Sequence, residues 1–344
     1  MKIACGMIVL NEEQFIGAWL RHHYEWFERI VVVEGADFCY PHESVTDRGL
    51  SVDRTAEIIR DFPDIEKKIT FIQHGWAGSA NSPEGYGKVV LRDVYARTLA
   101  QLKYDQLVCT ADADEFFRID HQQQIMKIIH DATDRLSRLR VVHEIFDDDG
   151  ETVQFDDINN ANKSIIEDAQ RRGMYRKTEH PPGKLSAFRF PTLHFYDGGV
   201  LSGGYFDIEH TRFWKWSPGH KYVYSNRRSH NSPVNEHGKS LINCGSSSLS
   251  RQFDVIPKQG IEEVASINDV AGYAHSTPCC HHFGFMRPQP ELKQRNRYYQ
   301  NRGEENSRPS TIADRYAIAE GNLQSRGISK LPWAGIDIKK EFNL

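Results

Sequence analysis

The segment Thr110-Ala-Asp-Ala-Asp-Glu-Phe-Phe117 decides the fold, because it joins a buried strand to a pair of carboxylates. The apolar run at 106–111 predicts that strand, and Asp112 and Asp114 come directly after it. Neighbouring carboxylates repel each other unless a cation lies close by. Oxygen ligands at such a place suit Mg²⁺ or Mn²⁺. The same two acids could instead only end a strand and cap the next turn, so the surrounding sequence has to decide.

The first 125 residues alternate between short apolar runs and helical patterns. Asn11 is expected to be the N-cap of the first helix, with Gln14 three residues later completing a capping box. This alternation predicts an α/β fold with a mostly parallel central sheet. Ligands of such sheets bind beyond the carboxyl ends of the strands, so Glu34 and the Asp112/Asp114 pair are expected at one edge. The runs that predict strands are 3–10, 30–33, 69–72 and 106–111, and the helical patterns cover 11–27, 53–62, 91–102 and 120–130.

After residue 140 the periodicity weakens. Residues 141–146 predict a strand, 147–172 are polar and acidic, and 189–224 are rich in aromatic residues, Gly and Pro. The last of these segments is typical of binding loops. A polar helix is predicted at 290–302. We therefore divide the chain into a first half (1–125), a second half of the same domain (126–285) and a C-terminal helical extension (286–344).

Composition limits the class of protein. The 344 residues include 43 Lys and Arg against 47 Asp and Glu, and this balance argues against a nucleic-acid partner. No apolar run approaches the roughly 20 residues of a membrane span, and no secretory signal is evident. We expect a cytoplasmic protein, with contact at a membrane surface left open. Six cysteines are too few for a disulfide scaffold.

Four segments in order resemble the landmarks of glycosyltransferase family 2 and its relatives with a DADE sequence. The resemblance covers roughly residues 1–125 and implies a GT-A (Rossmann-like) fold and a nucleotide-sugar donor. It thus implies that 1–125 is the nucleotide-sugar-binding half and 126–285 the acceptor-binding half. The segments are Met7-Ile-Val-Leu-Asn-Glu-Glu13, Ile30-Val-Val-Val-Glu-Gly35, Asp53-Arg-Thr-Ala-Glu-Ile-Ile59 and Cys109-Thr-Ala-Asp-Ala-Asp-Glu-Phe116.

The resemblance also implies roles for single residues. Glu34 would approach the base or the ribose, although the family more often has Asp there. Asp112 would contact the ribose or metal-bound water, Asp114 would bind the metal directly, and Glu115 would support that site. Residues expected to border the nucleotide are Leu10, Asn11 and Glu12, with Lys88 and Arg92 facing the diphosphate. A solvated helix face is the alternative for the two basic residues.

A late metal ligand and a general base are also expected. His282, in His282-Phe-Gly-Phe285, resembles the late ligand of related transferases, and His281 and His275 are weaker candidates. Zinc is disfavoured, because structural zinc ligands are usually spaced two to four residues apart. Asp207 and Glu209 are the candidate bases, in an aromatic segment suited to sugars. Glu236 and Asp254 remain alternatives.

The resulting hypothesis is a metal-dependent, hexosyltransferase-like glycosyltransferase. It would use Mn²⁺ or Mg²⁺ and move a sugar to a hydroxyl of a glycan or lipid-linked saccharide, with inversion implied by the resemblance alone. One alternative is a nucleotidyltransferase, which normally has a Gly-rich basic loop where this chain has Asn11-Glu-Glu13. The other is a carbohydrate-binding protein without activity. No nucleophile elbow or P-loop is present in the sequence.

Overall fold

The computed structural model describes most of the N-terminal part of the chain and separate segments of the rest. The chain forms two compact units. The first consists of Met1–Ile125 and Ser186–Leu344, and the second of Met126–Leu185. The described residues are 2–79, 87–102, 107–136, 140–146, 152–155, 162–180, 187–189, 192–196, 200–201, 211–215, 221–223, 232–234, 280–287, 289–301 and 342.

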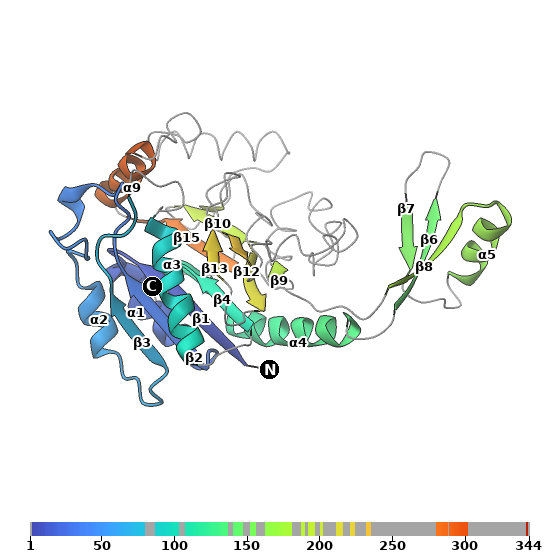
Figure 1. The fold of residues 1–344 in the computed structure, drawn as a ribbon, viewed down its shortest axis with the longest axis horizontal. Coiled ribbons are helices and arrows are strands. Elements are labelled where there is room, and N and C mark those ends of the chain that lie inside the picture. The colour runs from blue at the N-terminus through green and yellow to red at the C-terminus, as the bar shows by residue number, and fades with distance from the viewer. Residues whose placement is uncertain are drawn as a thin grey trace. The chain divides into compact units, whose positions relative to one another are not determined.

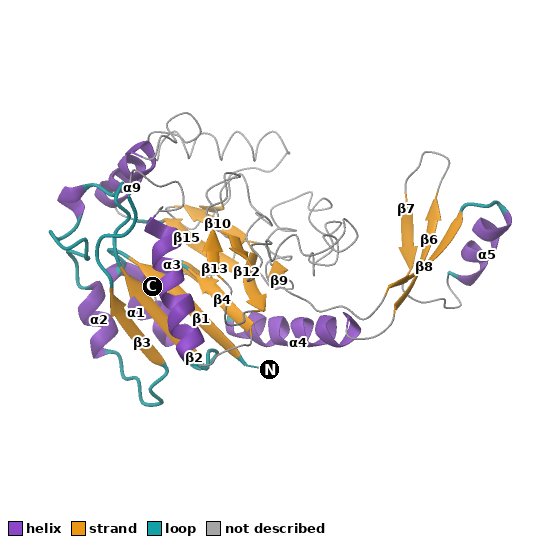
Figure 2. Cartoon of the chain, in the orientation of Figure 1, coloured by secondary structure: helices purple, strands orange, loops and turns teal. Residues whose placement is uncertain are grey.

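The first unit is built on a six-stranded sheet with the order β3-β2-β1-β4-β12-β9 (Figures 1 and 2). The first four strands are parallel, and the last two run antiparallel to their neighbours. This is the predicted α/β fold with a central parallel sheet flanked by helices. The strands are β1 (Ile3–Val9), β2 (Arg29–Glu34), β3 (Ile69–Gln73), β4 (Leu107–Ala111), β9 (Ala187–Arg189) and β12 (Thr211–Lys215).

Three helices flank the parallel strands. They are α1 (Glu13–His23), α2 (Thr55–Asp61) and α3 (Gly87–Gln101). The strand order reverses after β3, so right-handed crossovers put α3 on the face opposite to α1 and α2. The reversal also leaves a crevice between the carboxyl ends of β1 and β4, where open α/β sheets bind ligands.

The α3 face has an apolar core that explains a glycine in β1. Val31, Val108 and Leu99 are fully buried there with Tyr95. A Cβ atom at Gly6 would overlap the Tyr95 ring. Glycine therefore lets the α3 aromatic ring lie directly on the sheet.

The start of α1 differs from the prediction. Helix α1 begins at Glu13, and Asn11 makes no capping bond but adopts a positive φ of 53°. Its amide nitrogen donates to the Ser44 carbonyl at 2.8 Å, and its amide oxygen accepts from the Val52 backbone at 3.0 Å. The capping box is therefore wrong, because Asn11 is engaged in holding the loop between β2 and α2.

A second sheet places late residues against the Asp112–Phe117 segment. Its order is β11-β10-β15-β5, and β15 runs antiparallel to β5 with Cys280 opposite Phe117 and His282 opposite Glu115. Phe116 and Phe283 pack edge to face across this pair. These strands are β5 (Glu115–Phe117), β10 (Thr192–Tyr196), β11 (Val200–Leu201) and β15 (Cys280–Phe285), and β13 (Lys221–Val223) pairs separately with β14 (Ser232–Val234).

The second unit is a three-stranded antiparallel sheet with one helix. Its strands are β6 (Arg140–Phe146), β7 (Thr152–Phe155) and β8 (Tyr175–His180), in the order β7-β6-β8. Helix α5 (Lys163–Arg171) packs on it through Ile166 and Ala169, which are buried. The sequence predicted the first strand but none of the elements that follow within 147–172.

Two further α-helices and a short 3-10 helix, η1 (His42–Ser44), lie in the described part. Helix α4 (Ile119–Leu136) crosses the boundary between the units, and α9 (Gln289–Asn301) corresponds to the predicted polar helix. In the described part of the chain, no helix combines the length and apolar character needed to cross a membrane. The division of 126–344 into an acceptor half and an extension stays a prediction.

Candidate functional site

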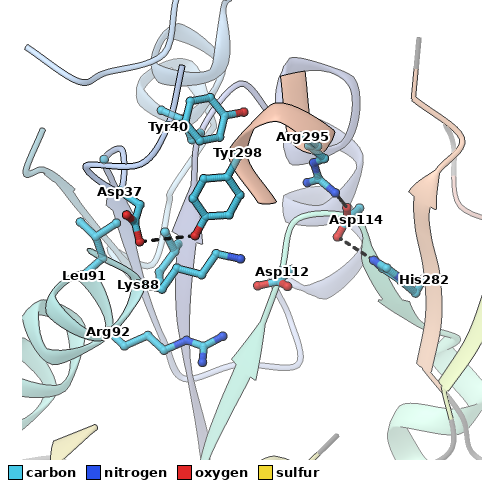
Figure 3. Close-up of a pocket in the computed structure, with 13 residues that line it drawn as sticks. Asp37, Tyr40, Lys88, Leu91, Arg92, Asp112, Asp114, His282, Arg295 and Tyr298 are labelled. Carbon is cyan, nitrogen blue, oxygen red and sulfur yellow. Dashed lines mark hydrogen bonds and ion pairs between the residues drawn. The ribbon is translucent and has the colours of Figure 1, made fainter. Parts of the chain in front are cut away.

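A cavity of about 120 Å³ lies at the crevice between β1 and β4, entirely within the first unit (Figure 3). It is bounded by the ends of both strands, by α3, by β15 and by α9. Its lining residues are Ile8, Leu10, Gly35, Asp37, Tyr40, Lys88, Leu91, Arg92, Asp112, Asp114, His282, Arg295 and Tyr298.

The two aspartates of the decisive segment both line this cavity but differ in their surroundings. Asp112 follows β4 and is partly exposed, whereas Asp114 is 1% exposed. The Glu115 carboxylate accepts the Asp112 backbone N–H at 3.2 Å and so stabilises the turn that carries both aspartates. Asp112 is thus the carboxylate more open to a ligand.

Asp114 is surrounded by cations. Its Oδ2 accepts from Arg287 at 2.8 Å and from Arg295 at 3.3 Å. His282 Nε2 lies 3.6 Å from its Oδ1. Burial alone would raise the pKa of Asp114, but the charges of His282, Arg287 and Arg295 outweigh it and hold that pKa well below the usual range. Asp114 is therefore an ionised buried carboxylate.

Glu12 is the second carboxylate of this network. It accepts from Arg287 in a short contact and from Arg295 at 3.2 Å. Burial raises the pKa of Glu12 to about 7, against the lowering effect of Arg287. Arg287 is buried between both acids, whose charges raise its pKa despite desolvation. Two arginines and two buried acids thus form one network, in which each charge has an opposite partner, and Glu291 adds a half-buried carboxylate 3.6 Å from Arg287.

A glycine allows His282 to approach this network. The Phe283 backbone N–H donates to the Asp114 carbonyl at 2.8 Å, which fixes β15 beside the turn. A Cβ at Gly284 would lie 2.5 Å from His282 Nε2 and 3.1 Å from Asp114 Oδ2. The predicted His-x-Gly pattern therefore has a steric reason in this fold.

Lys88 and Arg92 come from one face of α3, and both line the cavity. Figure 3 shows the two side chains extending toward the side where Asp112 lies. The sequence placed them near the diphosphate, and the structure places both in the cavity wall. Together with Arg295 they give the cavity three basic residues from two helices.

Three residues expected at the nucleotide serve as supports instead of lining the cavity. Glu34 is fully buried, with one oxygen accepting from the Ser51 backbone at 2.9 Å and the other from the Gln73 amide at 2.8 Å. Asn11 holds the same loop, and Glu12 belongs to the arginine network. Leu10, by contrast, does line the cavity.

Asp37 lies in the cavity wall three residues after Glu34. It accepts from the Cys39 backbone at 3.0 Å and from the Tyr298 hydroxyl at 3.3 Å. Tyr298 packs on Tyr40, with ring centroids 5.4 Å apart, and Lys88 Nζ lies 5.6 Å from the Tyr298 ring centre. This end of the cavity is aromatic and can stack against a flat ligand.

Sequence reasoning missed the contribution of α9 and of the residue before it. Arg295 and Tyr298 are three positions apart, so they share one helix face. That spacing within a predicted helix was the available signal. Arg287 lies two residues after the His282–Phe285 pattern. Asp207 and Glu209, with the alternatives Glu236, Asp254 and His275, lie outside the described residues.

The predicted metal ligands do not form a divalent-ion site as they are arranged. Asp114 already has two guanidinium groups on one oxygen and His282 near the other. Within the described ranges, no group of three or more His, Cys, Asp or Glu residues is positioned to hold a metal ion. A divalent ion at Asp114 would be repelled by the two arginines unless one of them moved away.

Comparisons with known proteins add little. No protein-family model matches the chain, and no curated protein matches it in sequence. Among solved structures, the chain is similar to S. aureus TarS at 18% identity, over 38% of this chain and 20% of that one, with a TM-score of 0.25. The chain thus spans about a fifth of the TarS chain, and the functional argument rests on the site itself.

Proposed function

We propose that this protein is a glycosyltransferase that moves a sugar from a nucleotide-diphosphate sugar to an acceptor hydroxyl. The observation that supports it best is the cavity at the β1–β4 crevice, which combines basic residues, an open carboxylate and an aromatic end. The basic residues suit phosphate groups, the carboxylate suits a ribose hydroxyl, and the aromatic end suits a nucleobase. The resemblance of residues 1–125 to family 2 glycosyltransferases agrees with this arrangement.

The residues have simple roles in the proposed reaction. The sugar–oxygen bond to the diphosphate breaks as the acceptor oxygen attacks, so negative charge grows on the departing diphosphate. Lys88, Arg92 and Arg295 would stabilise that charge. Asp207 or Glu209 would take the proton of the acceptor hydroxyl. Inversion at the sugar, a glycan or lipid-linked acceptor and the dependence on Mn²⁺ or Mg²⁺ stay predictions from the resemblance.

Release of the nucleotide tests this proposal. The full chain is incubated with UDP-, GDP- and dTDP-sugars, and free nucleoside diphosphate is measured by chromatography, with water as the slow acceptor. We expect one nucleotide class to be consumed. Arg92→Gln should lower this turnover at least tenfold, while Arg97→Gln, on an exposed position of the same helix, should not.

Two results would contradict the proposal. Release of pyrophosphate instead of a nucleoside diphosphate would indicate a nucleotidyltransferase. Failure of every nucleotide to bind would favour a protein without this activity.

A further inference from the structure

The two arginines on Asp114 differ in how firmly they are held. The Arg287 side chain is 1% exposed and donates to both Glu12 and Asp114. The Arg295 side chain is 31% exposed, and its contacts with the same acids are longer, at 3.2 and 3.3 Å. Removing Arg287 from the acids would leave a buried charge without compensation. Arg295 can leave them at a lower cost, because water already reaches it.

Arg295 also borders the space where a ligand would bind. It lines the cavity together with Lys88 and Arg92, whereas Arg287 does not. Figure 3 shows Arg295 above Asp114, with the cavity on the side of Asp112 and Lys88. A rotation about the side-chain bonds of Arg295 would turn its guanidinium group from Asp114 toward the cavity.

The charges favour an anion in this cavity over a cation. Of the three carboxylates in the lining, Asp114 is neutralised by arginines and Asp37 accepts from Tyr298 and Cys39. Asp112 faces two basic residues of α3. A divalent ion would have to compete with the arginines for Asp114. A diphosphate would gain charge-assisted hydrogen bonds, which are among the strongest that side chains make.

We propose that the diphosphate is bound by Arg295, Lys88 and Arg92 without a divalent ion, and that Arg295 transfers from Asp114 and Glu12 to the phosphate when the ligand binds. Asp114 then serves to hold Arg287 and to position Arg295. This inference rests on the proposed function for its ligand, but the binding of the phosphate groups can be tested separately.

The position of Arg295 on α9 connects ligand binding to the aromatic end of the cavity. Tyr298 follows one turn later and contacts Asp37 and Tyr40. Arg297 and Asn301 attach the outer side of the same helix to the 39–43 loop, through Glu43 at 2.7 Å and the Cys39 carbonyl at 2.9 Å. The helix is thus held on both sides, so only the Arg295 side chain has to move.

The experiment measures binding of inorganic pyrophosphate, UDP, GDP and dTDP to the full chain by calorimetry, in excess EDTA and in Mn²⁺. We expect pyrophosphate and one nucleotide to bind in EDTA with an affinity within about threefold of that in Mn²⁺. Arg295→Gln should weaken pyrophosphate binding in EDTA at least tenfold, and Arg295→Lys should weaken it less. Lys293→Gln, at an exposed position of the same helix, is the matched control and should bind as the unmodified protein does.

The outcomes separate this inference from the proposed function. Nucleotide binding that requires Mn²⁺ would overturn the inference and leave the glycosyltransferase in place. Pyrophosphate binding in EDTA without binding of any nucleotide would support the inference and contradict the glycosyltransferase. No binding of either ligand would overturn both. Equal binding by Arg295→Gln and Lys293→Gln, with both variants folded by circular dichroism, would also overturn it.

Discussion

Arg287 donates a hydrogen bond of 2.8 Å to Asp114, although the two residues are 173 positions apart in the chain. Both are nearly inaccessible to water, so each charge depends on the other and on Glu12. The predicted metal-binding carboxylate is therefore also the anchor of the C-terminal part of the described fold. The first consequence concerns stability.

Replacing Arg287 should destabilise the protein strongly. Arg287→Gln leaves Glu12 and Asp114 buried with one fewer cation, and breaking such a network costs about 3–5 kcal/mol. Arg287→Lys should recover part of this, because it restores the charge but not the two-pronged geometry. Urea unfolding measures both variants. Arg297→Gln, which removes an exposed ion pair, should change stability by less than about 1 kcal/mol. Similar losses for Arg287→Gln and Arg297→Gln would contradict the buried network.

A methyl group at Gly284 should displace His282. The Cβ would lie 2.5 Å from His282 Nε2, so one of the two has to move. We expect Gly284→Ala to cost about 1–3 kcal/mol. The double variant Gly284→Ala with His282→Ala should be more stable than the sum of the single changes predicts, since the second change removes the obstacle. Additive losses in the unfolding free energies would show that the contact is not the cause.

His23 should make stability fall in mild acid. Its Nε2 accepts from the Phe117 backbone at 3.1 Å, and its Nδ1 contacts the Trp19 carbonyl at 3.0 Å, so the ring must be neutral. Burial holds the pKa of His23 well below its usual range, with the charge of His22 acting in the same direction.

The sign follows from proton uptake by the unfolded chain. Above a pH of about 6.5 neither state binds this proton, and the stability is complete. As the pH falls below that value, only the unfolded chain takes the proton, so His23 contributes a loss of about 1.4 kcal/mol per pH unit. His281, whose pKa burial also lowers, contributes with the same sign. Unfolding in urea between pH 5.5 and about 7.5 measures the slope. His23→Gln should reduce it, and His130→Gln, at an exposed position, should leave it unchanged.

Replacing Asn11 should lower the stability of the protein, both through the loop that its side chain holds and through its own backbone conformation. Asn11→Ala loses two side-chain hydrogen bonds to the 44–52 loop and must keep a positive φ, which together cost about 2–3 kcal/mol. Asn11→Gly loses the same bonds but tolerates the φ. We therefore expect Asn11→Gly to be more stable than Asn11→Ala by about 1 kcal/mol in thermal or urea unfolding. The reverse order would refute the role of the backbone.

The parallel sheet could be predicted from the sequence because its strands are continuous apolar runs. Such runs at 3–10, 30–33 and 106–111 are needed where a strand is buried on both faces, and β1, β2 and β4 match them closely. Asp112 and Asp114 directly follow one of these runs, and this placed them at the carboxyl edge of the sheet. Lys88 and Arg92 were expected from the resemblance alone, and their spacing of four residues puts both on the face of α3 that lines the cavity.

The rest depended on pairings between distant segments. The β15–β5 pairing and the Arg287 and Arg295 contacts with Asp114 join residues more than 160 positions apart, and no local pattern encodes such partners. Glu34 illustrates the same limit. Its position at a strand end was predicted correctly, but the Ser51 and Gln73 contacts that remove it from the cavity come from neighbouring segments.

The network around Asp114 also sets when the site can form as the ribosome makes the chain. Glu12, Asp114 and the parallel strands are translated early. Arg287 and Arg295 are translated only after the unit of residues 126–185 and the segment that follows it. Until then, two carboxylates that are buried in the final fold have no arginine partners, and burying them would be costly. We therefore expect this edge of the sheet to stay hydrated until α9 has been translated.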